Sequence, residues 1–234
     1  MLYQIGYYFL LFFIYSVLGW VIESACVSII EKKIVLNRGF LLGPYCPIFG
    51  VSALVMILFL KDYANDFVVL FVMSMVLCTA IEYFTSVILE KLFKARWWNY
   101  KDKKFNIDGR VCLENAVLFG VLGVLVMKAV NPFFVRHLSA LSSTALLIIA
   151  GIIFVLFFID FIISTVVISK LRKNVVLLSG TDETNQITNQ VRERIKKNAS
   201  LKRRLINAFP SATADNLALR RIRDILNKHR KIKK

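Results

Sequence analysis

The chain has 234 residues, of which 57% are hydrophobic and only 20% are charged. Ordinary soluble domains carry about 25% charged residues, so this composition argues against a soluble globular protein and indicates a membrane protein. The net charge of +16 is uneven: residues 171–234 contribute +12 (17 Lys and Arg against 5 Asp and Glu), and residues 1–170 contribute +4 (14 against 10).

Five apolar stretches follow one another along residues 1–170. A helix needs about 20 mostly apolar residues to cross the hydrocarbon core of a bilayer. Four stretches meet this length, whereas the second meets it only if it absorbs the irregular segment GFLLGPYCP. The predicted spans lie near residues 5–30, 41–60, 67–89, 111–130 and 141–169. The sequence therefore predicts an all-α, polytopic membrane helix bundle of five transmembrane helices.

The first apolar stretch is expected to be a permanent span. A cleavable signal peptide has a basic region before its apolar segment, and the first basic residue here, Lys32, follows that segment. Lys and Arg in the short loops predict the orientation, because cytoplasmic loops are enriched in them. Within residues 1–170, 11 basic residues fall on one side of the predicted spans, counting Lys170, and 3 on the other. We therefore expect an N-out, C-in protein.

Residues 171–234 are expected to form a basic, helical cytoplasmic tail. Apolar residues recur there at roughly helical spacing among Lys and Arg: Val191, Ile195, Leu205, Ile206, Ile222, Ile225 and Leu226. A basic amphipathic helix can lie on anionic lipid, where each basic residue near the surface contributes about 1 kcal/mol. It could also bind an acidic partner, or remain solvated and only enforce the topology. We do not expect nucleic acid as its partner.

Three acids are predicted at similar depth in the cytoplasmic half of the bundle, about 6–12 Å inside the boundary at 1.5 Å per residue. Three arginines lie close to the same boundary. The acids are Glu23, Glu82 and Glu114, and the arginines are Arg38, Arg96 and Arg110. An acid near the centre of a span costs about 2.5–3.5 kcal/mol, so such acids usually face the bundle interior or a cavity. These groups either form ion pairs that lock the bundle or line a cytoplasm-facing site for a substrate, an ion or a headgroup.

Asp160 lies deeper than these acids. It is about ten residues, roughly 15 Å, from the end of the last predicted span, near the bilayer midplane. It could belong to a proton or ion path, or it could be protonated and hydrogen-bonded. The sequence names no partner for it.

Two predicted cytoplasmic loops have unusual compositions. Residues 37–47 place two glycines and two prolines at the entrance of a span, where irregular backbone is tolerated if protein or water covers it. Residues 96–110 combine aromatic and basic residues, which fits either an interface belt or a contact with a headgroup or partner. The candidates in these loops are Asn37, Gly39, Gly43, Pro44, Tyr45, Pro47, Trp97, Trp98 and Tyr100, together with Asp108.

Several function classes are disfavoured by missing motifs. The chain has no G-x-x-x-x-G-K-[ST] motif, so an ATP-driven transporter would need a separate ATPase subunit. Its two histidines, His137 and His229, are predicted outside the membrane and in the tail, which argues against histidine-based catalysis. The four cysteines, Cys26, Cys46, Cys78 and Cys112, lack C-x-x-C spacing and are expected to be reduced. No metal or cofactor is expected.

Several segments together resemble a known family. They are Gly19-Trp20 with Glu23, NRGFLLGPYCPIFG, Glu82-Tyr83, and RWWNY followed by FNIDGRVCLE. This set resembles the bacterial ABC-transporter type IV permeases, also called the CmpB-like permeases, over roughly residues 5–130. The resemblance implies a multi-pass protein of the bacterial cell membrane that contacts membrane lipids and works with a separate ATPase subunit. A homo-oligomer is a further expectation.

Three functional hypotheses follow. The first is a permease or transport component whose site is lined by the acids and arginines named above. The second is a membrane-embedded enzyme that acts on lipids or lipid-linked substrates at the cytoplasmic leaflet, with a carboxylate as general base and arginines holding a phosphate. The third is a structural or regulatory protein whose basic tail recruits partners.

Overall fold

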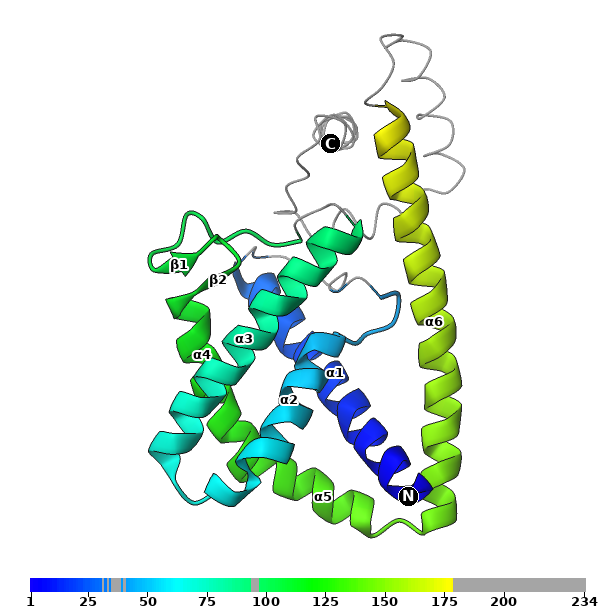
Figure 1. The fold of residues 1–234 in the computed structure, drawn as a ribbon. Coiled ribbons are helices and arrows are strands. Elements are labelled where there is room, and N and C mark those ends of the chain that lie inside the picture. Colours follow the sequence, from blue (N-terminus) through cyan, green and yellow to red (C-terminus); the bar gives the residue numbers. More distant parts are fainter. Residues whose placement is uncertain (31, 33, 35–38, 40, 94–96, 179–234) are drawn as a thin grey trace.

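The protein is a bundle of helices with one small hairpin (Figure 1). The computed structural model describes residues 1–30, 32, 34, 39, 41–93 and 97–178. The helices are α1 (Leu2–Ile30), α2 (Pro47–Leu60), α3 (Phe67–Phe93), α4 (Leu113–Leu125), α5 (Asn131–Ser139) and α6 (Ser143–Leu178). The 3₁₀ turn η1 (Lys61–Tyr63) follows α2, and the π-helical turn η2 (Val126–Val130) joins α4 to α5. The predicted tail helix lies outside the described residues, and α6 continues past residue 170.

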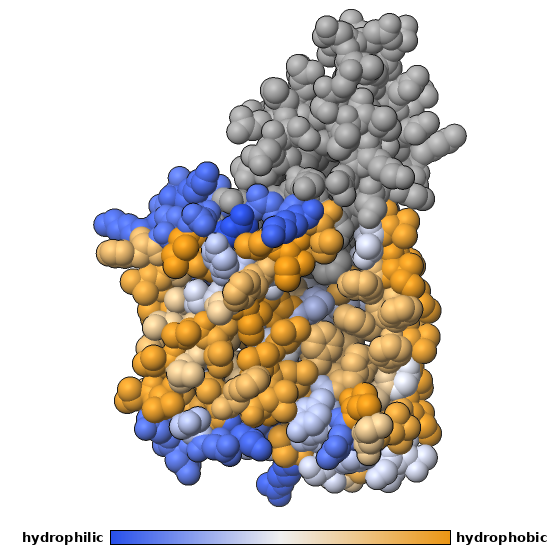
Figure 2. All heavy atoms as spheres, in the orientation of Figure 1, coloured by the Kyte–Doolittle hydropathy of each residue, from blue (hydrophilic) through white to orange (hydrophobic). Residues whose placement is uncertain are grey.

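Four of the described helical stretches are long and apolar enough to cross a membrane: Leu2–Ile29, Phe67–Leu92, Leu113–Ser139 and Ser143–Val166. Figure 2 shows the consequence on the surface, where apolar side chains form a broad band between two hydrophilic ends. A surface of this kind suits a hydrocarbon solvent, because water would make the exposed apolar area costly. The prediction of a multi-pass, all-α membrane bundle is confirmed.

The second predicted span is built differently from the others. Its helix, α2, has only 14 residues and is about 21 Å long, short of the roughly 30 Å hydrocarbon core. Residues 41–46 before it are not helical, so the span predicted near 41–60 would have to include the irregular segment, as its sequence implied. Pro44 and Pro47 explain the difference, because proline tolerates only the first turn of a helix and Pro47 stands there.

The start of α2 lies deep in the bundle rather than at its edge. The Cys46 backbone N–H donates to the carbonyl oxygen of Ser16 at 2.9 Å, and Ser16 is near the middle of the 29-residue helix α1. From there α2 runs to the end of the bundle that carries η1 and α5 (Figure 1). Helix α2 alone therefore covers about half of the depth that α1 covers, from the level of Ser16 to that end. The total of five crossings, and the N-out orientation, stay predictions.

The segment predicted as the start of the fourth span is a hairpin instead. Strand β1 (Asn106–Ile107) pairs antiparallel with β2 (Val111–Cys112), with Asn106 opposite Cys112. The turn uses Asp108 and Gly109, whose φ angles of +52° and +65° suit the Asp-Gly pair of a tight hairpin turn. Helix α4 consequently begins at Leu113, and it continues through η2 and α5 to Ser139, beyond the predicted end at residue 130.

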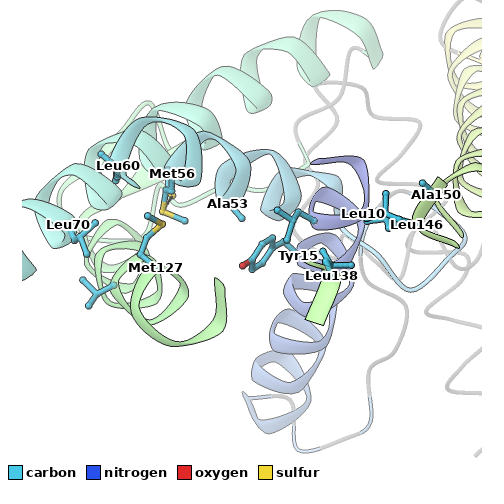
Figure 3. Packing of buried hydrophobic residues seen from close by; sticks show 13 residues of the cluster. Leu10, Tyr15, Ala53, Met56, Leu60, Leu70, Met127, Leu138, Leu146 and Ala150 are labelled. Atoms are coloured by element: carbon cyan, nitrogen blue, oxygen red, sulfur yellow. Dashed lines mark hydrogen bonds between the residues drawn. The ribbon is translucent and has the colours of Figure 1, made fainter. Parts of the chain in front are cut away.

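Small residues let α2 pack closely against α1. A Cβ atom on Gly50 would lie 2.3 Å from Ser16 Oγ and 2.4 Å from the backbone oxygen of Phe12. Such contacts between small residues are typical of helix packing in membranes, where dispersion rather than water drives association. The core around this crossing draws on every long helix (Figure 3) and includes Leu10, Tyr15, Ala53, Met56, Leu60, Leu70, Met127, Leu146 and Ala150. Helix α6 joins it through only part of its surface, since most of its apolar side chains are exposed.

Candidate functional site

Asp160 on α6 holds the irregular segment 41–46 inside the bundle. Its carboxylate accepts hydrogen bonds from the backbone N–H groups of Leu42 (3.0 Å) and Gly43 (2.7 Å) and from the Tyr45 hydroxyl. The Ser164 hydroxyl, one turn along α6, donates a fourth bond at 3.0 Å. Asp160 is 9% exposed, so these bonds lie where no water replaces them. We call this group the Asp160 clasp.

Aromatic rings and a glycine shape the Asp160 clasp. The Tyr45 ring packs against Phe13 of α1 and Phe157 of α6, with ring centroids 5.4 and 5.3 Å apart. A Cβ atom on Gly43 would lie 2.1 Å from the Tyr45 ring, so only glycine fits beside it. The sequence marked Gly43 and Tyr45 as candidates, and the structure explains both through Asp160, which the candidate set omitted.

A second polar cluster surrounds Glu82 of α3, which is 7% exposed. The Tyr100 hydroxyl donates to Glu82 Oε1 at 3.2 Å, and Asn115 of α4 lies beside both groups. Burial, and then the negative charge of Glu82, raise the pKa of Tyr100 well above its usual value, while a hydrogen bond with Asn115 opposes the shift. Tyr100 therefore keeps its proton at any physiological pH and acts as a hydrogen-bond donor to Glu82.

Segment 41–46 also connects the Asp160 clasp to the acids of the other helices. The Cys46 thiol donates to Glu23 Oε2 on α1 at 3.5 Å, next to the Tyr45–Asp160 contact. Glu23 in turn lies within electrostatic range of Glu82. Glu23 and Glu82 therefore lie near each other, and segment 41–46 contacts Glu23 as well as Asp160.

Arg110 binds the outer end of the same face of α3. Its guanidinium pairs with Glu90 at 2.6 Å, donates to Ser86 Oγ at 3.1 Å and lies 5.9 Å above the Tyr83 ring. Tyr83 donates to Asp108, a candidate that is exposed in the hairpin turn. Of the arginines predicted near the acids, Arg110 therefore pairs with a carboxylate, but with Glu90 rather than with Glu82.

The aromatic residues of the second loop pack against the protein. Trp97 is 8% exposed, and the Trp98 indole N–H donates to the backbone oxygen of Arg110 at 2.8 Å. Tyr100 points to Glu82, and its backbone N–H donates to Gly109 O. The Trp98 bond and the Tyr100 backbone bond tie this loop to the hairpin, and the Tyr100 hydroxyl joins it to Glu82 of α3. The interface or headgroup role expected of these side chains stays a prediction.

Glu114 lies apart from Glu23 and Glu82. It forms an ion pair with Lys103 at 2.7 Å, and both side chains are more than half exposed, at 61% and 52%. That hydrogen bond raises the pKa of Lys103. Because α4 begins at Leu113, position 114 faces outward and the next residue, Asn115, faces Glu82.

Some of the remaining candidates lie within the described residues, and others lie outside them. Gly39 has a φ of +79°, which suits a glycine, Pro44 is exposed and Pro47 starts α2. Asn37, Arg38 and Arg96 lie outside the described residues. None of the four cysteines forms a disulfide, and within the described part of the chain no three His, Cys, Asp or Glu side chains converge on a metal position.

Replacing Arg110 with alanine tests how far this outer contact stabilises the bundle. We expect Arg110→Ala to lower the free energy of unfolding by about 1–3 kcal/mol, because the change leaves Glu90 and Ser86 without a half-buried cationic donor. Lys103→Ala is the matched control, since it removes a cation from an exposed pair and should leave the unfolding midpoint unchanged. Thermal unfolding of the purified protein in detergent measures both; equal midpoints for the two variants would contradict the role of Arg110.

Comparison with known proteins agrees with this architecture. No curated protein and no solved structure shows significant similarity to the chain. The family model described as "Putative ABC-transporter type IV" matches residues 10–165, well over half of the 234 residues. This range includes the Asp160 clasp, the Glu82 cluster and the whole hairpin. The chain therefore belongs to this ABC-transporter type IV family.

Proposed function

We propose that the chain is a permease, the membrane-embedded component of a transporter in the bacterial cytoplasmic membrane. The observation that carries the proposal is the non-helical segment 41–46 ahead of α2, whose Leu42 and Gly43 backbone N–H groups are bonded to Asp160 of α6 inside the bundle. Within a membrane, irregular backbone occurs where protein buries it or where it lines a water-filled cavity. In transporters, broken helices of this kind form the substrate and ion sites near the midplane.

The polar groups of the proposed permease include acids beside the Asp160 clasp and beside the hairpin. Glu23 contacts Cys46, next to Tyr45 of the clasp, and Glu82 contacts Tyr100 of the hairpin loop. The basic-rich hairpin is predicted to be cytoplasmic, so this polar site would open toward the cytoplasm. Buried acids inside a span are costly and usually functional, which supports a transport site there over a purely structural ion-pair lock.

The energy source of the permease is proposed to be a separate ATPase subunit. The family description refers to ABC transporters, and the chain has no P-loop of its own. The hairpin would offer a rigid cytoplasmic contact, because its strands and the Trp98 bond brace it internally, and Tyr100 and Arg110 bond it to α3. A partner could therefore bind there without ordering a flexible loop, which lowers the entropic cost of association.

Affinity purification of the tagged chain from its native membranes tests the proposal. We expect an ATPase subunit to co-purify and to hydrolyse ATP in nanodiscs, and we expect Glu23→Gln and Glu82→Gln to lower that hydrolysis while the complex still forms. Glu114→Gln is the control, because Glu114 is exposed and outside the polar cluster. A chain that never carries an ATPase, or that chemically changes the lipids of the nanodisc, would contradict the proposal; the second result would support a lipid-modifying enzyme.

A further inference from the structure

Helix α3 carries a line of polar side chains at every fourth position. They are Ser74, Cys78, Glu82, Ser86 and Glu90, and the first four are 0%, 5%, 7% and 3% exposed. Each step of four residues turns the line by about 40°, so neighbouring members lie one turn apart and the line winds partly around the helix over about 24 Å of its length. We call this set the α3 ladder. Most of the depth of the bundle therefore has a polar line inside it, with Glu82 near its centre.

Glu82 is incompletely satisfied in this position. Its Oε1 atom accepts the Tyr100 hydroxyl and Asn115 lies within hydrogen-bonding range of the carboxylate, whereas the Oε2 atom is fully buried and has no hydrogen-bond partner among the described residues. Among the same residues, Arg110 is bound to Glu90 and Ser86 of the ladder rather than to Glu82. A buried carboxylate oxygen that accepts no hydrogen bond indicates that a ligand or a proton belongs there.

The groups that face Glu82 come from every neighbouring element. They are Cys78 on α3 itself, Glu23 on α1, Asn115 on α4, and Tyr100 of the hairpin loop. The set contains a second acid and no base. Two ionised carboxylates in such surroundings repel each other and are poorly solvated, and one bound cation relieves both effects. A metal ion would need several ligands, and no three suitable side chains converge in the described residues, whereas a proton needs only one oxygen.

We propose that Glu82 is a proton-binding site that exchanges its proton with the hairpin side of the membrane along Ser86 and Glu90. When the proton leaves Glu82 Oε2 for bulk water, a carboxylate remains, and Arg110 is bonded to Ser86 one helical turn away as its counter-charge. Toward the other side, the Cys78 thiol donates to the Met56 thioether at 3.7 Å instead of to Glu82. Thioethers hold no exchangeable proton.

The inference deepens the proposed function, since it rests on the same polar site and makes that site respond to protons. A permease whose central acid loads a proton from one side would move its substrate together with that proton or be switched by it. Infrared spectroscopy of the isolated chain, without an ATPase, tests the proton site separately from the permease proposal. A negative infrared result would not affect whether an ATPase co-purifies, and a failure to co-purify an ATPase would not affect the infrared result.

Infrared spectroscopy of the purified chain in nanodiscs tests the inference, because a protonated carboxyl gives its own C=O stretching band. We expect the wild-type protein to show this band at neutral pH, Glu82→Gln to lose it and Glu114→Gln to retain it. Glutamine has the shape of protonated glutamate and can accept the Tyr100 bond, so the variant should fold. Tyr100→Phe removes the donor to the carbonyl and should shift the band to higher frequency, which gives a second readout if Glu82→Gln does not fold.

Three outcomes would overturn the inference. The first is the absence of the band in the wild-type protein at every pH in the neutral range. The second is a band that persists in Glu82→Gln and does not move in Tyr100→Phe. The third is displacement of the band by sodium chloride but not by potassium chloride at constant pH, which would assign the site to sodium instead of the proton.

Discussion

Asp160→Ala is expected to lower the free energy of unfolding by about 3 kcal/mol or more, because each buried donor left unsatisfied costs about 1–3 kcal/mol. The change orphans the backbone N–H groups of Leu42 and Gly43 and the Tyr45 hydroxyl at once. Segment 41–46 should then leave its place against α1. Cys46, now 4% exposed, should become reactive toward a thiol reagent, and mass spectrometry of the labelled peptide measures that rate.

The control for this prediction is Asp62→Ala, which removes an exposed acid at the opposite end of the bundle and should change neither quantity. Asp160→Asn should fall between the two, because the amide keeps one acceptor oxygen and turns an unwanted N–H₂ group toward the donors. Wild-type stability and an unreactive Cys46 in Asp160→Ala would show that the Asp160 clasp does not hold segment 41–46.

Gly50→Ala is the second substitution with a large expected effect. Its Cβ would overlap Ser16 Oγ at 2.3 Å and the Phe12 backbone oxygen at 2.4 Å, and the backbone cannot yield as a flexible side chain can. Helices α1 and α2 must separate, which we expect to cost about 1–3 kcal/mol or more from overpacking alone. The unfolding midpoint in detergent should fall accordingly.

Gly151→Ala provides the matched control for Gly50→Ala. It places the same methyl group on a helix of the same protein, but nothing lies within 4 Å of that position on α6. Alanine is favoured over glycine in helices by about 1 kcal/mol, so this variant should be as stable as the wild type or slightly more stable. If the two glycine variants behave alike, the close α1–α2 contact is not what limits helix packing here.

The long spans could be predicted from the sequence because they depend on composition alone. Stretches such as Phe67–Leu92 and Ser143–Val166 are apolar throughout and need no partner to be recognised. The ends were less accurate where another element sets them. Val111 and Cys112 are apolar enough to begin a span, but their pairing with Asn106 and Ile107 makes them a strand and delays α4 to Leu113.

The polar site was predictable only in part, for two physical reasons. The partners of Asp160 are backbone N–H groups nearly 120 residues away, and every sequence has such groups, so no residue pattern announces them. The outward direction of Glu114 depends on where α4 starts, which a hairpin decides; a shift by one residue turns a helix position by 100° and brings Asn115 inward instead. Glu82 could be identified without knowing its distant partners or the start of a helix, because an acid within a long apolar span stands out in the sequence.

The most direct test of the account is the side of the membrane on which two positions lie. Lys32→Cys and Asp62→Cys, which flank segment 41–46 and α2, can each be placed in a background without other cysteines and labelled with a membrane-impermeant reagent in sealed vesicles of both orientations. We predict that position 32 is labelled only from the cytoplasm and position 62 only from outside the cell, because segment 41–46 and α2 complete one crossing. Labelling of both positions from the same side would show that this crossing does not exist, and it would contradict the proposed cytoplasm-facing site.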